Sequence, residues 1–133
     1  MKNKPFKSRS VGEFGERYAV HYLRRHGYTV KEKNYRAGHH EIDIVATTWS
    51  SVVFVEVKAR SYRPEELDVL PPPGHAVNAD KQRFTRQAAR QYLFEHPTKK
   101  KPRMDVIELW LEASSDAEKK PRVLRIRHIK GAY

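Results

Sequence analysis

The stretch that decides the fold is Glu41-Ile42-Asp43-Ile44-Val45-Ala46-Thr47, followed after a short break by Val52-Val53-Phe54-Val55-Glu56-Val57-Lys58-Ala59. Both segments are rich in β-branched residues, which favour strands, and Thr48-Trp49-Ser50-Ser51 between them is typical of a hairpin turn. In the second segment apolar side chains occupy both faces, as in a strand covered on both sides. We therefore predict two hairpin strands, over 41–47 and 52–59, with the second near the centre of a sheet.

The rest of the chain predicts helices and further strands around this hairpin. A first helix is expected from near Ser10, where Ser10 and Glu13 have capping-box spacing, to Gly27. A second helix should run from the N-cap Asn78 to about His96, before Pro97. Further strands are expected over 28–35, 104–111 and 123–129.

The predicted order is helix, three strands, helix, two strands, which indicates an α/β fold with a mixed central β-sheet flanked by helices. The length of 133 residues favours one domain over 1–133, with a basic N-terminal tail over about 1–9. The Pro-rich segment 61–77 is expected to be a long loop without helix or strand, either functional or mobile.

The charge of the chain points to a polyanionic partner. There are 27 Lys plus Arg against 16 Asp plus Glu, which gives a net charge of +11 and attracts nucleic acid or anionic membrane. No apolar run reaches the ~20 residues that span a bilayer, and no signal-like stretch follows the basic start. Cysteine is absent, which excludes disulfides and thiolate zinc sites. We expect a cytoplasmic protein that binds nucleic acid and no membrane.

Asp43, Glu56 and Lys58 are the candidate catalytic residues. Side chains alternate along a strand, so Glu56 and Lys58 should point the same way. A hairpin closed through Trp49-Ser50 pairs residues whose numbers sum to 99, which places Asp43 opposite Glu56 and Glu41 opposite Lys58.

Such an arrangement of carboxylates needs a compensating charge. Two opposed carboxylates repel each other, and burying them is unfavourable unless a cation such as Mg²⁺ lies between them. A metal activates bound water, and Lys58 would position that water or stabilise charge on a phosphate. The alternative is an ordinary exposed ion pair between Glu56 and Lys58.

On these residues the chain resembles known nucleases. Asp43 with Glu56-Val57-Lys58 resembles the PD-(D/E)xK signature of restriction-endonuclease-like nucleases. Over roughly residues 11 to 110 the chain resembles the YraN-like bacterial family, which is related to archaeal Holliday-junction resolvases. The resemblance is carried by Gly12, Gly15-Glu16, Ala19, Tyr22-Leu23, Gly27-Tyr28, Asn34-Tyr35-Arg36, Glu41-Ile42-Asp43-Ile44-Val45, Phe54-Val55-Glu56-Val57-Lys58-Ala59-Arg60, Lys81 and Met104-Asp105-Val106.

This resemblance implies a restriction-endonuclease-like fold, metal-binding acids at Asp43 and Glu56, and a catalytic lysine at Lys58. Glu16 matches an acid that the resolvases bring to the metal, so it joins the catalytic and metal-binding set. Glu16 also falls on an apolar helical stripe, and its other interpretation is a first-turn partner of the helix dipole. Resolvases are dimers, so a homodimer is expected by analogy.

Basic residues supply candidate nucleic-acid ligands. Arg83, Arg86 and Arg90 form one stripe of the second helix, while Lys81 continues the stripe expected to pack on the sheet and should point towards the catalytic face or its rim. With Arg60 these are the expected nucleic-acid-binding residues; a merely solvated stripe is the alternative.

Two further residues carry expectations of their own. Asp105 is expected to be structural and to pair with a nearby arginine. Trp49, in the hairpin turn, would either stack on a base or act as a packing cover, which is the commoner role for a single turn aromatic.

The sequence thus predicts an endonuclease that depends on Mg²⁺ or Mn²⁺ and cleaves DNA with activated water. Branched and single-stranded DNA are among the expected substrates. One alternative is a non-catalytic nucleic-acid-binding protein on a nuclease fold. Another is a small basic ribosome-associated protein, whose binding would survive the loss of Asp43, Glu56 and Lys58.

Overall fold

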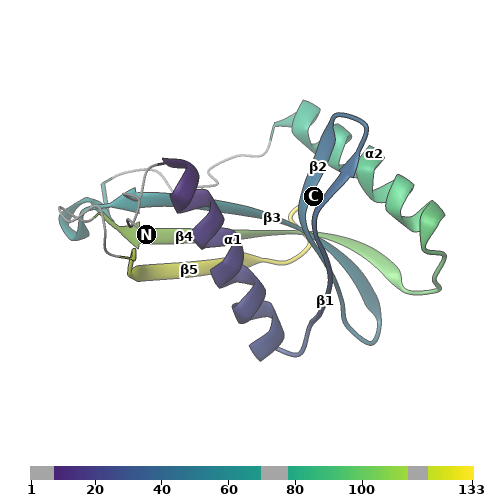
Figure 1. Ribbon diagram of the computed structural model, residues 1–133, viewed down its shortest axis with the longest axis horizontal. Helices are drawn as coiled ribbons and strands as arrows, with labels where there is room; N and C mark the ends of the chain where they lie inside the picture. Colours follow the sequence, from purple (N-terminus) through teal and green to yellow (C-terminus); the bar gives the residue numbers. More distant parts are fainter. Residues whose placement is uncertain (1–7, 70–77, 114–119) are drawn as a thin grey trace, which may run out of the picture.

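The computed structural model describes residues 8–69, 78–113 and 120–133 (Figure 1). Its elements are α1 (Ser8–Arg25), β1 (Thr29–Ala37), β2 (His40–Thr47), β3 (Ser51–Tyr62), the 3₁₀ helix η1 (Pro64–Glu66), α2 (Ala79–Glu95), β4 (Lys101–Glu112) and β5 (Val123–Ile129). The strands form one sheet in the order β1-β2-β3-β4-β5, in which only the β3–β4 pair is parallel. The predicted mixed sheet and element order are confirmed, and they are the order expected of a restriction-endonuclease-like fold.

The sheet is covered on both faces because β3 alternates apolar residues to each side. Val53 and Val55 join the core beneath α1, whereas Val52 and Phe54 join the core beneath α2. All four are nearly inaccessible to solvent, and β3 occupies the middle of the sheet. The prediction of a central strand covered on both sides is confirmed, and this alternation places the even-numbered Glu56 and Lys58 on the side of α2.

The end of α1 follows the predicted glycine signal, but its start does not follow the predicted cap. Gly27 has φ +86°, the amide of Tyr28 donates to the carbonyl of Leu23, and that of Gly27 donates to the carbonyl of Arg24. These two bonds form a Schellman motif, which glycine favours because it adopts positive φ readily. Since α1 already includes Ser8, Ser10 lies inside the helix and is not its N-cap.

The expectation of a structureless segment over 61–77 is wrong in its first part. β3 continues to Tyr62, whose side chain is buried, and η1 follows directly. Residues 70–77, like tail residues 1–7, lie outside the described residues. Within 8–69, 78–113 and 120–133, no helix is long and apolar enough to cross a bilayer.

The hairpin of β2 and β3 has the predicted register, but its ladder is short. The paired residues are Ile44–Val55, Val45–Phe54, Ala46–Val53 and Thr47–Val52, so each pair sums to 99. Beyond Ile44 and Val55 the two strands separate, and β2 rises away from β3 towards α2 (Figure 1). The candidate carboxylates lie at this point of separation.

Candidate active site

Asp43 lies where the ladder between β2 and β3 ends. Its Oδ2 accepts a hydrogen bond of 2.7 Å from the backbone amide of Val57, so the carboxylate occupies the place that a backbone partner would otherwise take. Asp43 and Glu56 are therefore not a cross-strand pair, and the predicted opposition of the two is wrong. The predicted opposition of Glu41 and Lys58 is wrong as well, because the β2–β3 ladder does not extend beyond Ile44–Val55.

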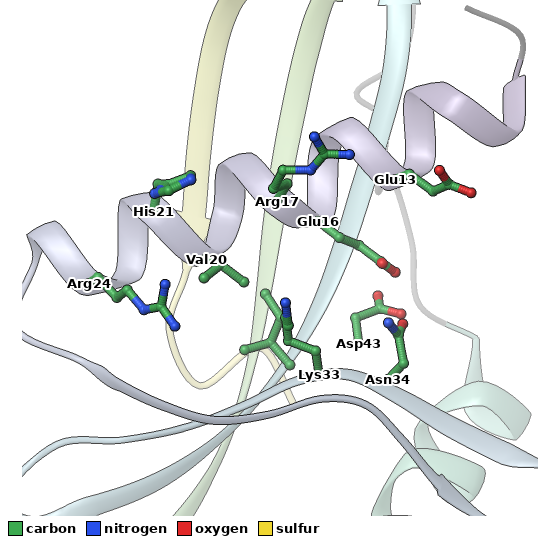
Figure 2. Close-up of a pocket in the computed structure, with 10 residues that line it drawn as sticks. Glu13, Glu16, Arg17, Val20, His21, Arg24, Lys33, Asn34 and Asp43 are labelled. Atoms are coloured by element: carbon green, nitrogen blue, oxygen red, sulfur yellow. The ribbon is translucent and has the colours of Figure 1, made fainter. Parts of the chain in front are cut away.

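Glu16 of α1 meets Asp43 from the opposite side of the gap. Their side chains are hydrogen-bonded, and Figure 2 shows the two carboxyl groups facing each other between the helix and the sheet. Burial, the charge of Asp43 and this hydrogen bond together raise the pKa of Glu16 to about 7. Burial also raises the pKa of Asp43. Near neutral pH Glu16 is therefore partly protonated, which relieves the repulsion between the two groups.

The position of Glu16 excludes one of its two interpretations. Because α1 begins at Ser8, Glu16 lies about two turns beyond the positive end of the helix dipole, which acts only over the first turn. The dipole interpretation is wrong. The apolar stripe that predicted an inward direction is buried, with Ala19, Val20 and Leu23 at 4% exposure or less.

Glu56, Lys58 and Lys81 form a second cluster on the side of α2. The Lys58 Nζ lies 2.9 Å from Glu56 Oε1, and the Lys81 Nζ lies 3.6 Å from the same oxygen. The predicted common direction of Glu56 and Lys58 is confirmed, as is the direction of Lys81 towards this face. The Glu56 side chain is 8% exposed and that of Lys58 is 38% exposed, so the acid is enclosed while the lysine reaches solvent.

The second carboxylate oxygen of Glu56, Oε2, takes no part in these two ion pairs. Oε2 is buried and has no hydrogen-bond partner among the residues that the structure describes. A buried carboxylate oxygen without a partner is unfavourable, and a hard divalent cation is the ligand that carboxylate oxygens prefer. The donor set of Glu56, Asp43 and Glu16 is therefore chemically suited to Mg²⁺ or Mn²⁺. Over the described ranges, however, no three acidic or histidine side chains already converge into one metal-binding group.

The predicted nucleic-acid ligands on α2 are exposed, but two of them have intramolecular partners. The Arg83 Nη2 lies 3.2 Å from Asp80 Oδ1, and the Arg86 guanidinium lies 5.5 Å from the ring centre of Tyr133. Arg90 lies beside the same ring in a shallow pocket, and Arg60 is exposed near the end of β3. The shared face of Arg83, Arg86 and Arg90 is confirmed, and their binding of nucleic acid stays a prediction.

Two residues of the site escaped the sequence analysis. Glu108 of β4 lies beside Lys58 in the parallel register, is 1% exposed, and its Oε1 lies 3.4 Å from Arg127 Nε. Its apolar flanks, Ile107 and Leu109, are the same signal that Val55 and Val57 give for Glu56. Tyr133 is hydrogen-bonded to Thr85 of α2 and lies near Glu56. Burial and the negative charge of Glu56 both raise the pKa of Tyr133. No local pattern marks Tyr133.

The expectations for Asp105 and Trp49 have opposite outcomes. Asp105 is buried and accepts bonds of 2.9 and 2.8 Å from Arg103, which confirms its structural pairing with an arginine. Trp49 is 91% exposed, so the interpretation as a packing cover is wrong.

Comparison with known proteins places this site in a family. The sequence model of the uncharacterised protein family UPF0102 matches residues 15–109. A UPF0102 protein of Alkaliphilus oremlandii is 37% identical over 129 residues, which is 95% of this chain and 99% of the relative. A UPF0102 protein of Bacteroides thetaiotaomicron is 36% identical over 123 residues, 92% of this chain and 91% of the relative. The chain belongs to the UPF0102 family.

The UPF0102 match covers the candidate site from Glu16 to Glu108 and stops before β5, so Tyr133 lies outside it. A further UPF0102 protein, of Caldicellulosiruptor bescii, is 35% identical over 127 residues, 94% of this chain and 98% of the relative. These relatives establish the family and the extent of the shared domain, and their names state no activity.

Proposed function

We propose that this UPF0102 protein is a PD-(D/E)xK-type endonuclease, of the kind found in YraN-like proteins and resolvases, that cleaves DNA with Mg²⁺ or Mn²⁺. The observation that carries the proposal is the unpartnered, buried Oε2 of Glu56 beside Lys58. A structural ion pair has no need of such an atom, since leaving a buried charged oxygen unpaired costs about 1–3 kcal/mol or more.

The acids and Lys58 would have different roles in this reaction. Glu56, Asp43 and Glu16 would hold the metal, which when bound supplies a Lewis acid and lowers the pKa of water. Lys58 uses one direction of its ammonium group for Glu56, and its partly exposed Nζ can donate to a phosphate oxygen or a water from another direction. Lys81 places a second positive charge near the same carboxylate from α2.

Glu16 and Asp43 provide a place to hold a proton. A carboxyl group whose pKa is about 7 is partly protonated at neutral pH, so the pair would release this proton on taking up the metal. The hydrogen bond from Val57 keeps Asp43 oriented while its partner gains or loses that proton. The site therefore combines an oriented carboxylate pair with a positioned ammonium group.

Metal binding is the first test. Calorimetric titration of Mn²⁺ into the wild-type protein should give a saturable isotherm, and Glu56→Gln, which keeps the side-chain volume, should weaken binding at least about ten-fold. Glu65→Gln is the matched control, because the Glu65 side chain is 71% exposed and lies outside the site. Equal binding by wild type and Glu56→Gln would remove the support for a metal site at Glu56.

Cleavage is the second test. Labelled single-stranded, duplex and four-way-junction DNA are incubated with Mg²⁺ or Mn²⁺ and with wild type, Lys58→Ala or the surface control Lys31→Ala. We expect wild type and the control to cleave DNA. The cleavage rate of Lys58→Ala should be lower by roughly 10²–10³-fold, the usual effect of removing one donor that stabilises a transition-state charge. If all three bind DNA and none cleaves, the protein is a nucleic-acid-binding module on a nuclease fold.

A further inference from the structure

A cavity of about 320 Å³ lies between α1 and the β1–β2 hairpin, next to the Glu16–Asp43 pair (Figure 2). Charges of both signs line it: the acids are Glu13, Glu16 and Asp43, and the cations are Arg17, Arg24 and Lys33. Within the described ranges, neither Arg24 nor Lys33 forms an ion pair. In the part of the chain that the structure describes, these two cations therefore have no anion to neutralise them.

Both cations are directed to this cavity by the fold. Glu16, Val20 and Arg24 follow each other at four-residue intervals, which puts them on one stripe of α1. Lys33 pairs with Ile44, whose side chain belongs to the core beneath α1, and directly paired residues share a face. Lys33 thus projects from the sheet towards the same stripe of the helix.

We propose that this cavity binds the phosphate backbone of one strand of nucleic acid, with Arg24 and Lys33 as phosphate ligands; the assignment of the strand rests on the proposed function. From Glu16 to Arg24 the helix rises about 12 Å, the length of three to four nucleotides at ~3.4 Å each.

This surface is separate from the arginine stripe of α2. Asn34 adds support, because it lines the cavity beside Asp43 and holds φ +52° within β1. A non-glycine residue at positive φ inside a strand is uncommon, and such strain gathers at functional sites. The amide of Asn34 offers a donor and an acceptor to a bound strand.

The test compares two double variants with the same loss of charge. Arg24→Ala/Lys33→Ala removes the two proposed phosphate ligands and keeps Arg17, which also lines the cavity, whereas Arg25→Ala/Lys31→Ala removes their neighbours, which do not line it. Binding of a fluorescein-labelled single-stranded DNA oligonucleotide is followed by anisotropy in EDTA at several salt concentrations. The cavity variant should bind roughly 25-fold more weakly at 0.1 M salt, and its salt slope should fall by about 1.4, the value for two lost phosphate contacts. The control should stay within about three-fold of wild type.

Equal weakening by both double variants, or no binding by wild type, would overturn the proposal. The exchange Arg24→Lys/Lys33→Arg keeps both charges and should preserve binding, which separates the role of charge from any effect on folding. Because EDTA prevents metal-dependent cleavage, the result does not depend on the nuclease proposal. If the wild-type protein fails to cleave DNA, only the proposed nuclease activity is refuted. If both double variants lose binding equally, only the proposed binding of a strand in this cavity is refuted.

Discussion

The pH dependence of stability should follow Asp105, whose carboxylate closes a buried network between β4 and the end of the chain. Besides Arg103, it accepts bonds from His128 Nε2 at 2.6 Å and from the Gly131 amide at 3.0 Å. Burial alone would raise the pKa of Asp105, but the hydrogen bonds from His128, Arg103 and Gly131 outweigh it and lower the pKa from 3.8 to about 2.

The direction of the pH dependence of stability follows from the lowered pKa of Asp105. A carboxyl group whose pKa is lower in the folded state contributes stability that is complete above pH ~4 and is lost as the pH falls through the folded value. The shift of Asp105 corresponds to about 2 kcal/mol in total, of which roughly 1 kcal/mol is lost by pH 3. Asp105→Asn abolishes this dependence and leaves the partly buried Arg103 without its carboxylate partner, so it should cost about 3 kcal/mol at pH 6.

The assay is urea unfolding at pH 6 and pH 3, followed by the fluorescence of Trp110, which is 3% exposed. The stability difference between wild type and Asp105→Asn should be about 1 kcal/mol smaller at pH 3 than at pH 6. Asp68→Asn is the control, since the Asp68 side chain is 93% exposed and its removal should change neither value by more than ~0.5 kcal/mol. A difference that is identical at both pH values would refute the assignment of the acid-sensitive stability to Asp105.

Further predictions concern local packing, capping and exposure, each measured as the free energy of unfolding in urea. Gly15→Ala should destabilise by about 1–3 kcal/mol, because the added Cβ would come 2.7 Å from the Cβ of Ala59. In the same helix Gly12→Ala meets nothing within 4 Å and should stabilise by about 0.5–1 kcal/mol; equal effects at both positions would contradict the packing argument. Asn78→Ala should cost about 1 kcal/mol, because it removes the 2.8 Å cap on the Lys81 amide, and no loss would mean that the cap is dispensable. Trp49→Ala should stay within ~0.5 kcal/mol of wild type, and a larger loss would contradict its exposure.

The sequence alone determined the features that depend on neighbours along the chain. The period of two along the central strand placed Glu56 and Lys58 on one face, and the length of the turn set the register that ends at Ile44–Val55. Gly27 and Asn78 ended and began helices where their local chemistry predicts, because capping involves only a few adjacent residues.

Only the tertiary structure decided how these local pieces meet. The sequence does not reveal that β2 and β3 separate. A continuous ladder therefore could not predict that the Asp43 carboxylate accepts a hydrogen bond from the Val57 amide, or that Asp43 contacts Glu16. Glu108 comes beside Lys58 through parallel pairing across α2, a contact between residues 50 positions apart. Side-chain periodicity is a local property, whereas the pairing of distant strands and the approach of α1 depend on which apolar faces the folded chain buries together.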